Sequence, residues 1–279
     1  MESFIEKVRL ASENVRSFLC VGLDPNPQLM PITDVFEFNR AIIDATIDIV
    51  CAYKPNMAFY EALGLQGMNS LVRTVEYIKQ KGAHTLIIGD GKRGDIGSSM
   101  AAYYTAMYES WGFDAITVAP YMGKDSILPI PGNGKGVFVL CRTSNPGAQD
   151  FQDLSVTISG KSLPLYQHVA LKCSEWNIDQ NIGLVVGATY PAELKQTTMV
   201  CPNMPILIPG VGTQGGDLPS AIRWGCDQNG RNIIVNSSRQ ILYSSTNNDF
   251  DISARQEALR INQEIDAILT ICLLYTSPS

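Results

Sequence analysis

Residues 85–97 read TLIIGDGKRGDIG, a short apolar run that passes directly into alternating charges. An unbroken apolar run of this length is typical of a strand that is buried on both faces of a parallel sheet. The charged residues that follow it are Asp90, Lys92, Arg93 and Asp95. Parallel α/β proteins place their ligand sites at the carboxyl ends of the strands. The stretch therefore predicts a parallel sheet and the edge at which a site would form.

The same pattern recurs along the chain. Eight apolar, β-rich runs end in polar or glycine-containing residues, at positions 18–24, 49–56, 85–90, 114–120, 136–142, 182–189, 206–212 and 232–238. Amphipathic segments separate them, such as residues 69–81, where Leu71, Val75 and Ile78 fall at helical spacing. Eight such repeats in 279 residues predict an α/β protein with a closed (β/α)8 TIM barrel rather than an open sheet. No GxGxxG sequence follows the first run, which argues against a dinucleotide-binding fold.

The composition is that of an ordinary packed domain of enzyme size. The chain is 45% hydrophobic and 17% charged, and its formal net charge is −6. A nucleic-acid or anionic-membrane partner would require a clustered cationic surface, which this balance disfavours. No apolar run is long enough to span a membrane, and the charged start of the chain lacks the apolar core of a signal peptide.

The cysteines and histidines argue for reduced thiols and against a metal site. Three of the seven cysteines, Cys20, Cys51 and Cys141, lie inside apolar runs, where a thiol behaves as a small apolar side chain. We therefore expect a cytoplasmic protein without disulfides. No CxxC pair occurs, and His84 and His168 lie far from any cysteine pair, so we expect no metal ion.

Two segments depart from the repeat. Residues 145–181 form a long excursion after the fifth run, which we expect to be a loop or short hairpin at the rim of the barrel that carries the site. Residues 272–279, CLLYTSPS, interrupt the preceding helical spacing and back-translate to TGT CTC TTA TAC ACA TCT CCG AGC, which resembles a sequencing adapter. We therefore expect a single barrel domain over residues 1–271 and a non-native tail over residues 272–279.

The ends of the eight runs deliver many polar side chains to one rim, namely Asp24, Lys54, Asp90, Lys92, Asp95, Ser144, Gln214 and Arg239. Asp90 and Lys92 are two residues apart, so on an extended strand end their side chains point the same way. Neighbouring carboxylate and ammonium groups favour each other's charged forms, which would keep Lys92 a positioned acid. An isolated DxKxxD pattern is usually a solvated surface turn, but its position after a buried strand favours a site.

Lys54 and Asp24 each have two interpretations. Lys54 ends an apolar run, where an ammonium is costly unless carboxylates such as Asp24 and Asp90 lie beside it. A lysine that extends to solvent at a strand end is equally compatible with the sequence. Asp24 precedes Pro25 and could serve only to initiate a turn.

Two turns after the last runs predict a phosphate site. Residues 211–217 (VGTQGGD) and residues 236–239 (NSSR) follow the seventh and eighth runs, where barrels of this class commonly bind phosphate. Backbone N–H groups of glycine-rich turns suit an anion, and Arg239 adds a bidentate cation. Gly215 and Gly216 would also allow this loop to close as a lid.

Together these residues resemble the orotidine 5'-monophosphate decarboxylase family, in its longer-chain bacterial branch, over the chain to about Thr270. The motifs appear in family order: VGLDP at 21–25, KPN at 54–56, DGKRGDIG at 90–97, TSNPG at 143–147, PGVGTQGG at 209–216 and VNSSR at 235–239. The resemblance implies a barrel of the ribulose-phosphate-binding type. It also implies cofactor-free decarboxylation of orotidine 5'-monophosphate to uridine 5'-monophosphate in de novo pyrimidine biosynthesis.

The resemblance assigns a role to each candidate residue around the reacting carbon. Lys92 would protonate C6 of the pyrimidine as carbon dioxide leaves, and Asp90 would lie beside the departing carboxylate. Lys54 and Asp24 would bind the ribose hydroxyls, and Ser144 would read the pyrimidine.

The remaining implied roles concern the phosphate and a second subunit. Gln214 and Arg239 would hold the 5'-phosphate of the nucleotide. Asp95, with Ser99 nearby, would enter the neighbouring subunit's site, which implies a homodimer with shared sites. Position 99 is more often threonine in the family, and serine keeps the hydroxyl.

Three alternatives remain open from the residues. A magnesium-dependent hexulose-phosphate synthase or keto-gulonate-phosphate decarboxylase would use the same DxK scaffold, with carboxylates as metal ligands. A catalytically silent phosphate-binding barrel would lack Lys92 or Asp95, and both are present. An aldolase could use Lys54 to form a Schiff base.

Overall fold

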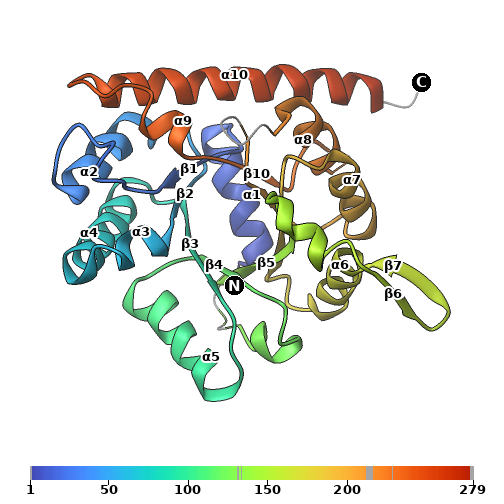
Figure 1. Cartoon of the computed structure of the whole chain (residues 1–279). Coiled ribbons are helices and arrows are strands. Elements are labelled where there is room, and N and C mark those ends of the chain that lie inside the picture. Colours follow the sequence, from blue (N-terminus) through green and yellow to red (C-terminus); the bar gives the residue numbers. More distant parts are fainter. Residues whose placement is uncertain (1, 131, 133, 212–215, 228, 277–279) are drawn as a thin grey trace.

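Eight parallel strands close into a barrel in the computed structural model of the chain, which describes residues 2–130, 132, 134–211, 216–227 and 229–276 (Figure 1). Around the barrel they are β1 (Leu19–Leu23), β10 (Ile233–Ser237), β9 (Ile206–Ile208), β8 (Ile182–Val186), β5 (Gly136–Arg142), β4 (Ala115–Val118), β3 (Leu86–Arg93) and β2 (Ala52–Pro55). Every neighbouring pair is parallel. The (β/α)8 barrel is therefore confirmed, and each strand lies within or overlaps one of the eight apolar runs.

Helices lie outside the strands, as the amphipathic segments predict (Figure 1). The longer ones are α2 (Val35–Thr46), α4 (Gly64–Lys81), α5 (Gly97–Tyr104), α6 (Leu165–Trp176), α7 (Pro191–Val200), α8 (Leu218–Gly225) and α10 (Phe250–Thr276). In α4 the side chains of Leu71, Val75 and Ile78 are buried, which is the face that their helical spacing predicts. Short elements are α3 (Met57–Glu61), α9 (Arg239–Leu242), the π-helix η1 (Thr105–Ser110) and the 3-10 helices η2 (Lys124–Ser126) and η3 (Pro146–Asp150).

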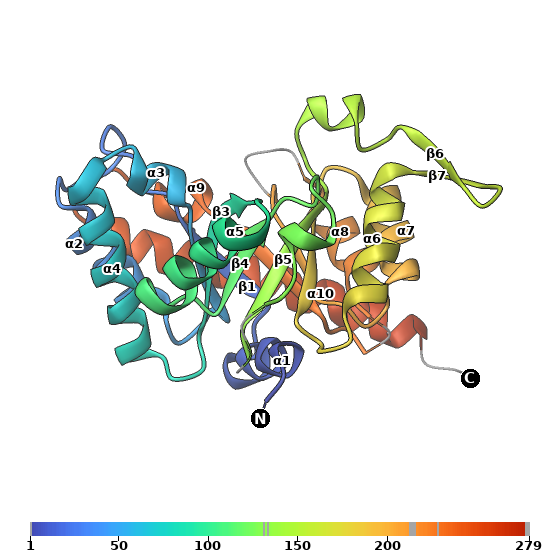
Figure 2. The ribbon, with the colours of Figure 1, turned by 90° about the horizontal axis from the view of Figure 1, so that it is seen from below.

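Helix α1 (Phe4–Val15) covers the amino ends of the strands (Figure 2). The ring of Phe4 packs edge-on against Phe138 inside the barrel, with ring centroids 5.6 Å apart. Gly136 makes room for it, because a Cβ at this position would lie 2.1 Å from the Phe4 ring. Lys7 Nζ also pairs with Asp114 Oδ1 at 2.5 Å, at the start of β4. The amino end is thus closed, and the carboxyl end remains for a site.

The excursion after β5 contains the expected hairpin. Strand β6 (Ser155–Ile158) pairs antiparallel with β7 (Lys161–Pro164), and α6 follows at once. In Figure 2 the hairpin projects from the molecule on the side away from α1. The excursion therefore belongs to the same end of the barrel as the carboxyl ends of the strands.

The last helix, α10, runs to Thr276 and includes residues 272–276 of the segment that the sequence sets apart from the barrel. Although α10 is 27 residues long, no helix in the described part of the chain is both long and apolar enough to cross a membrane.

Candidate active site

A polar cavity of about 490 Å³ lies at the carboxyl ends of the barrel strands. Six of the nine residues that the sequence predicts for the site line this cavity: Asp24, Lys54, Asp90, Lys92, Ser144 and Arg239. They follow or end five different strands, so the barrel closure brings together residues that are far apart in the chain.

Asp90 is the centre of a charged group in the cavity. Its Oδ2 accepts a hydrogen bond from Lys54 Nζ at 2.7 Å, and its Oδ1 accepts one from Lys92 Nζ at 2.7 Å. Lys54 and Asp90 are only 4% and 8% exposed, whereas the Lys92 side chain is 50% exposed. The ammonium of Lys92 is therefore more accessible to a ligand in the cavity than the ammonium of Lys54.

The pKa shifts show why this buried group stays charged. Burial alone would raise the pKa of Asp90, but the ammonium groups of Lys54 and Lys92 outweigh burial and hold that pKa well below its usual range. Burial alone would lower the pKa of Lys54, and the carboxylates of Asp90 and Asp24 reverse this effect and raise it. Lys54 and Asp90 thus keep each other in the charged form.

The backbone at Lys92 is left-handed, with φ of 45°. A non-glycine residue in this region costs about 1–3 kcal/mol and is kept only where its surroundings enforce it. The pairing of β3 with β4 also shifts register between Gly89 and Arg93. The expectation of a regular extended strand end at Asp90 and Lys92 is therefore wrong, although their side chains do meet.

Thr117 of β4 connects Asp90 and Lys92 at this irregular end of β3. Its Oγ1 accepts a hydrogen bond from Lys92 N at 2.9 Å and donates one to Asp90 Oδ1 at 2.9 Å. The side chain is buried, and the residue lines the cavity. Thr117 is not predicted from the sequence, because a threonine within the apolar strand AITV looks like an ordinary β-branched strand residue.

Asp24 lies beside this group, but no lysine or arginine of the described residues is close enough to form an ion pair with it. Burial raises the pKa of Asp24, and Lys54 and the hydroxyl of Ser238 offset only part of that effect. Its Oδ1 is buried and has no hydrogen-bond partner among the described residues. The Tyr243 hydroxyl donates to the Asp24 carbonyl at 2.8 Å, which fixes the loop after β1. A fixed, unpartnered carboxylate oxygen is ready to accept a ligand hydroxyl.

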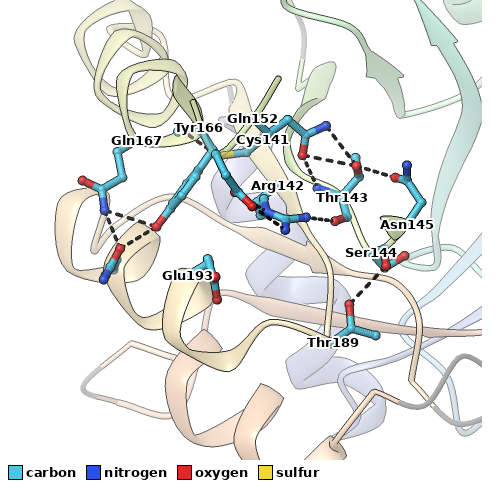
Figure 3. A network of polar contacts seen from close by, with 12 residues as sticks. Cys141, Arg142, Thr143, Ser144, Asn145, Gln152, Tyr166, Gln167, Thr189 and Glu193 are labelled. Carbon is cyan, nitrogen blue, oxygen red and sulfur yellow. Dashed lines mark hydrogen bonds and ion pairs between the residues drawn. The ribbon is translucent and has the colours of Figure 1, made fainter. Parts of the chain in front are cut away.

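Ser144 follows β5, between two other cavity residues, Thr143 and Asn145. Its backbone lies close to the end of β8, where a Cβ on Gly187 would be 2.8 Å from Ser144 Cβ. Thr189 Oγ1 donates to the Ser144 carbonyl at 3.3 Å (Figure 3). Gln152, which the sequence also does not predict as a site residue, lines the cavity from the excursion.

Arg239 begins α9, directly after β10, and lines the cavity with Gly210 and Val211. The residue is exposed, and no carboxylate among the described residues lies within ion-pair distance of it. This guanidinium is therefore available to an anion. Gln214 belongs to residues 212–215, which lie outside the described residues.

Asp95 and Ser99 do not line the cavity of their own chain. Asp95 is half-buried after β3, where its Oδ1 accepts a hydrogen bond from Ile96 N at 2.8 Å, and Ser99 is exposed on α5.

A second cavity, of about 710 Å³, lies along α5, and its apolar lining includes Met100, Tyr104, Leu128 and Ile130. Ile96 also lines it and is 53% exposed.

The carboxylates in the first cavity are those of Asp24 and Asp90. Within the described part of the chain, no group of three or more His, Cys, Asp or Glu side chains gathers in a way that could hold a metal ion. The arrangement instead offers a fixed ammonium beside a carboxylate at one place and a guanidinium at another. It can donate a proton to a developing carbanion while an anionic group is held apart from the reacting atom.

Comparisons with known proteins point in the same direction. The model of the family described as "Orotidine 5'-phosphate decarboxylase / HUMPS family" matches residues 17–248. A curated orotidine 5'-phosphate decarboxylase from Dehalococcoides mccartyi is 46% identical over 265 residues, which cover 94% of this chain and 97% of that protein.

Two solved structures are also similar. A putative orotidine-monophosphate-decarboxylase from Toxoplasma gondii is 32% identical, with a TM-score of 0.89 and 98% of both chains covered. A UMP synthase from Leishmania donovani is 35% identical, with a TM-score of 0.86. The match covers 96% of this chain, which spans 57% of the length of that synthase.

Proposed function

The chain belongs to the orotidine 5'-phosphate decarboxylase / HUMPS family and decarboxylates orotidine 5'-monophosphate to uridine 5'-monophosphate, and we propose that Asp90 and Lys92 carry out this reaction without a cofactor. The observation that carries the proposal is the position of the Lys92 ammonium. It is half-exposed in the cavity, and its Nζ is held 2.7 Å from Asp90 Oδ1.

In the proposed reaction the bond between C6 of the pyrimidine and its carboxylate breaks. The electron pair stays on C6, carbon dioxide leaves, and Lys92 gives its proton to C6 before regaining one from water. No π acceptor adjoins C6, so fixed charges must stabilise the developing carbanion. The ion pair holds the Lys92 ammonium in place before the substrate arrives, and repulsion by Asp90 favours departure of the substrate carboxylate.

The other cavity residues bind the parts of the nucleotide that do not react. The unpartnered Oδ1 of Asp24 and the ammonium of Lys54 would bind the ribose hydroxyls. Arg239, together with Gln214, would hold the 5'-phosphate, and Ser144 would read the pyrimidine. Binding energy from the remote phosphate would hold the reacting carbon against the charged group.

A homodimer with shared sites would account for Asp95 and Ser99. Both lie outside the cavity of their own chain, beside the largely apolar cavity along α5. A second copy packed on α5 would cover Ile96 and bring Asp95 toward the partner's site. An exposed apolar surface of this kind is typical of a protein–protein interface.

The protein would act in the cytoplasm, in de novo pyrimidine biosynthesis. Cys20, Cys51, Cys141, Cys173 and Cys201 are buried free thiols, which supports a reducing compartment. Orotidine 5'-monophosphate must be supplied by a reaction that attaches a ribose phosphate to orotate.

Turnover of orotidine 5'-monophosphate, followed by the loss of orotate absorbance with and without a chelator, tests the proposed function. We expect the absorbance loss to proceed at the same rate in both cases. No turnover of this substrate would contradict the assignment. Turnover that the chelator abolishes, and that magnesium restores, would instead support the metal-dependent alternative.

A further inference from the structure

Arg142 lies at the end of β5 and is only 1% exposed (Figure 3). Its Nε and Nη2 donate to the two carboxylate oxygens of Asp153 at 2.8 and 3.0 Å. The guanidinium carbon also lies 3.8 Å from the centre of the Tyr190 ring. A buried guanidinium with a bidentate carboxylate and an aromatic face has little freedom to move. Arg142 therefore links strand β5 rigidly to Asp153 in the excursion and to Tyr190, which precedes α7.

The remaining guanidinium nitrogen of Arg142 holds the peptide that leads into Ser144. Its Nη1 donates to the Thr143 carbonyl at 2.5 Å. A trans peptide is planar, with its C=O and N–H pointing in opposite directions. Fixing the Thr143 carbonyl therefore also fixes the direction of the Ser144 N–H. Arg142 itself is not among the residues that line the cavity, so it acts on the site through this peptide.

Gln152 holds Thr143 from the excursion. Its Oε1 accepts a hydrogen bond from Thr143 N at 2.8 Å, and its Nε2 lies 3.0 Å from Thr143 Oγ1. The Thr143 hydroxyl in turn lies 2.7 Å from Asn145 Oδ1. The carbonyl, the amide and the hydroxyl of Thr143 are thus all held by side chains. A simple turn before Pro146 would need none of these contacts.

We propose that Arg142 is a positioning residue that sets the discrimination of this enzyme between pyrimidine bases, by fixing the Thr143–Ser144 peptide. The inference rests on the proposed role of Ser144 in reading the pyrimidine. Asp153 holds Arg142, and Gln152 holds the Thr143 side of that peptide through the Thr143 N–H and hydroxyl. The excursion therefore contributes to base recognition, although it lies outside the barrel strands.

Binding of uridine and cytidine 5'-monophosphates tests the proposal, since they share ribose and phosphate and differ at the pyrimidine edge. Calorimetry on the full chain gives the ratio of the two dissociation constants. Arg142→Lys keeps the charge and loses the planar fork. We expect it to reduce the preference for uridine 5'-monophosphate by about tenfold, the scale on which a binding site loses selectivity when a polar group is misplaced. Asp153→Asn should reduce it in the same direction.

Arg255→Lys is the matched control. Arg255 also forms a bidentate pair, with Asp48 at 2.6 and 2.8 Å, but on the outer surface of the protein and away from the cavity. It should leave the preference unchanged. If Arg142→Lys does not fold, Asp153→Asn and Gln152→Ala decide the matter.

Three outcomes would overturn the proposal. The first is an unchanged preference in folded Arg142→Lys, and the second is an unchanged preference in both Asp153→Asn and Gln152→Ala. The third is equal affinity of the unaltered protein for the two nucleotides, which would refute base reading by Ser144. The decarboxylase assignment is tested by turnover of orotidine 5'-monophosphate, so the third outcome would leave that assignment in place.

Discussion

Thr117→Val removes one hydroxyl from the charged group and nearly preserves the shape of the side chain. That hydroxyl donates to Asp90 Oδ1 and accepts from Lys92 N, each at 2.9 Å. The substitution therefore removes one of the contacts that hold the Asp90 carboxylate and also the side-chain acceptor of Lys92 N, where the backbone has φ of 45°. The proton donor should remain present but be less well positioned.

The expected fall in kcat can be estimated from the two hydrogen bonds that the substitution removes. A hydrogen bond to an ionised group contributes about 1.5–3 kcal/mol, and one between neutral groups, such as that of the part-buried Lys92 N–H, about 0.5–1.5 kcal/mol. Part of this loss will appear as lower stability rather than as slower chemistry. Since about 1.4 kcal/mol corresponds to a factor of ten in rate, we expect kcat to fall by about ten- to a hundredfold. KM should change much less, because Thr117 is not assigned a contact with the phosphate or the ribose.

The loss of orotate absorbance under saturating substrate measures kcat. Thr117→Ser keeps the hydroxyl and should recover most of the activity. Thr197→Val is the control, because Thr197 is also buried but donates to Glu193 O within α7 at 2.8 Å, away from the cavity. A kcat for Thr117→Val within twofold of the original would refute the positioning role. Failure of Thr117→Ser to recover activity would also refute it.

Three further predictions concern the phosphate, the dimer and stability. Arg239→Ala should lower kcat/KM for the nucleotide, with a loss of transition-state stabilisation of about 2–3 kcal/mol, because a charge-assisted contact is lost. The kcat/KM for the unphosphorylated nucleoside should stay unchanged. An equal loss for both substrates would exclude phosphate binding by Arg239. Mixed Lys92→Ala and Asp95→Ala subunits should regain activity in hybrid dimers, and no recovery after proven subunit exchange would argue against shared sites. Asp90→Asn should lower the free energy of unfolding at neutral pH by about 3 kcal/mol, because it leaves the Lys54 ammonium buried without its partner. The depressed pKa of Asp90 stabilises the fold above the unfolded carboxyl pKa of about 4 and loses this effect as pH falls. The deficit in denaturant melts should therefore shrink in acid, and a constant deficit would contradict this reasoning.

The barrel could be predicted from the sequence because buried parallel strands are nearly continuous apolar runs. The run at residues 182–189, for example, contains β8 (Ile182–Val186). The ends of the strands differ from the ends of the runs, since β2 begins only at Ala52 although its run begins at residue 49. The run at residues 85–90 also ends before β3 does, because the strand continues to Arg93 through a register shift in its pairing with β4.

Most of the candidate site was predictable because charged residues stand out at the ends of apolar runs, and Ser144 is the uncharged exception. Asp90 and Lys92 interrupt an apolar pattern, so they attract notice. Thr117 and Gln152 do not, because their importance depends on which strand lies beside β3 and on how the excursion folds over β5. The left-handed backbone at Lys92 likewise arises from tertiary contacts and has no signature in a lysine between glycine and arginine.

The non-native origin of residues 272–279 remains a proposal. Continuous coding sequence for these residues in a genomic clone would contradict it.

Lys92→Ala tests the central claim most directly, because it removes the proposed proton donor and leaves the phosphate and ribose contacts in place. We predict that the loss of orotate absorbance falls to the background rate while uridine 5'-monophosphate still binds in calorimetry. Near-original turnover by folded Lys92→Ala would contradict the account.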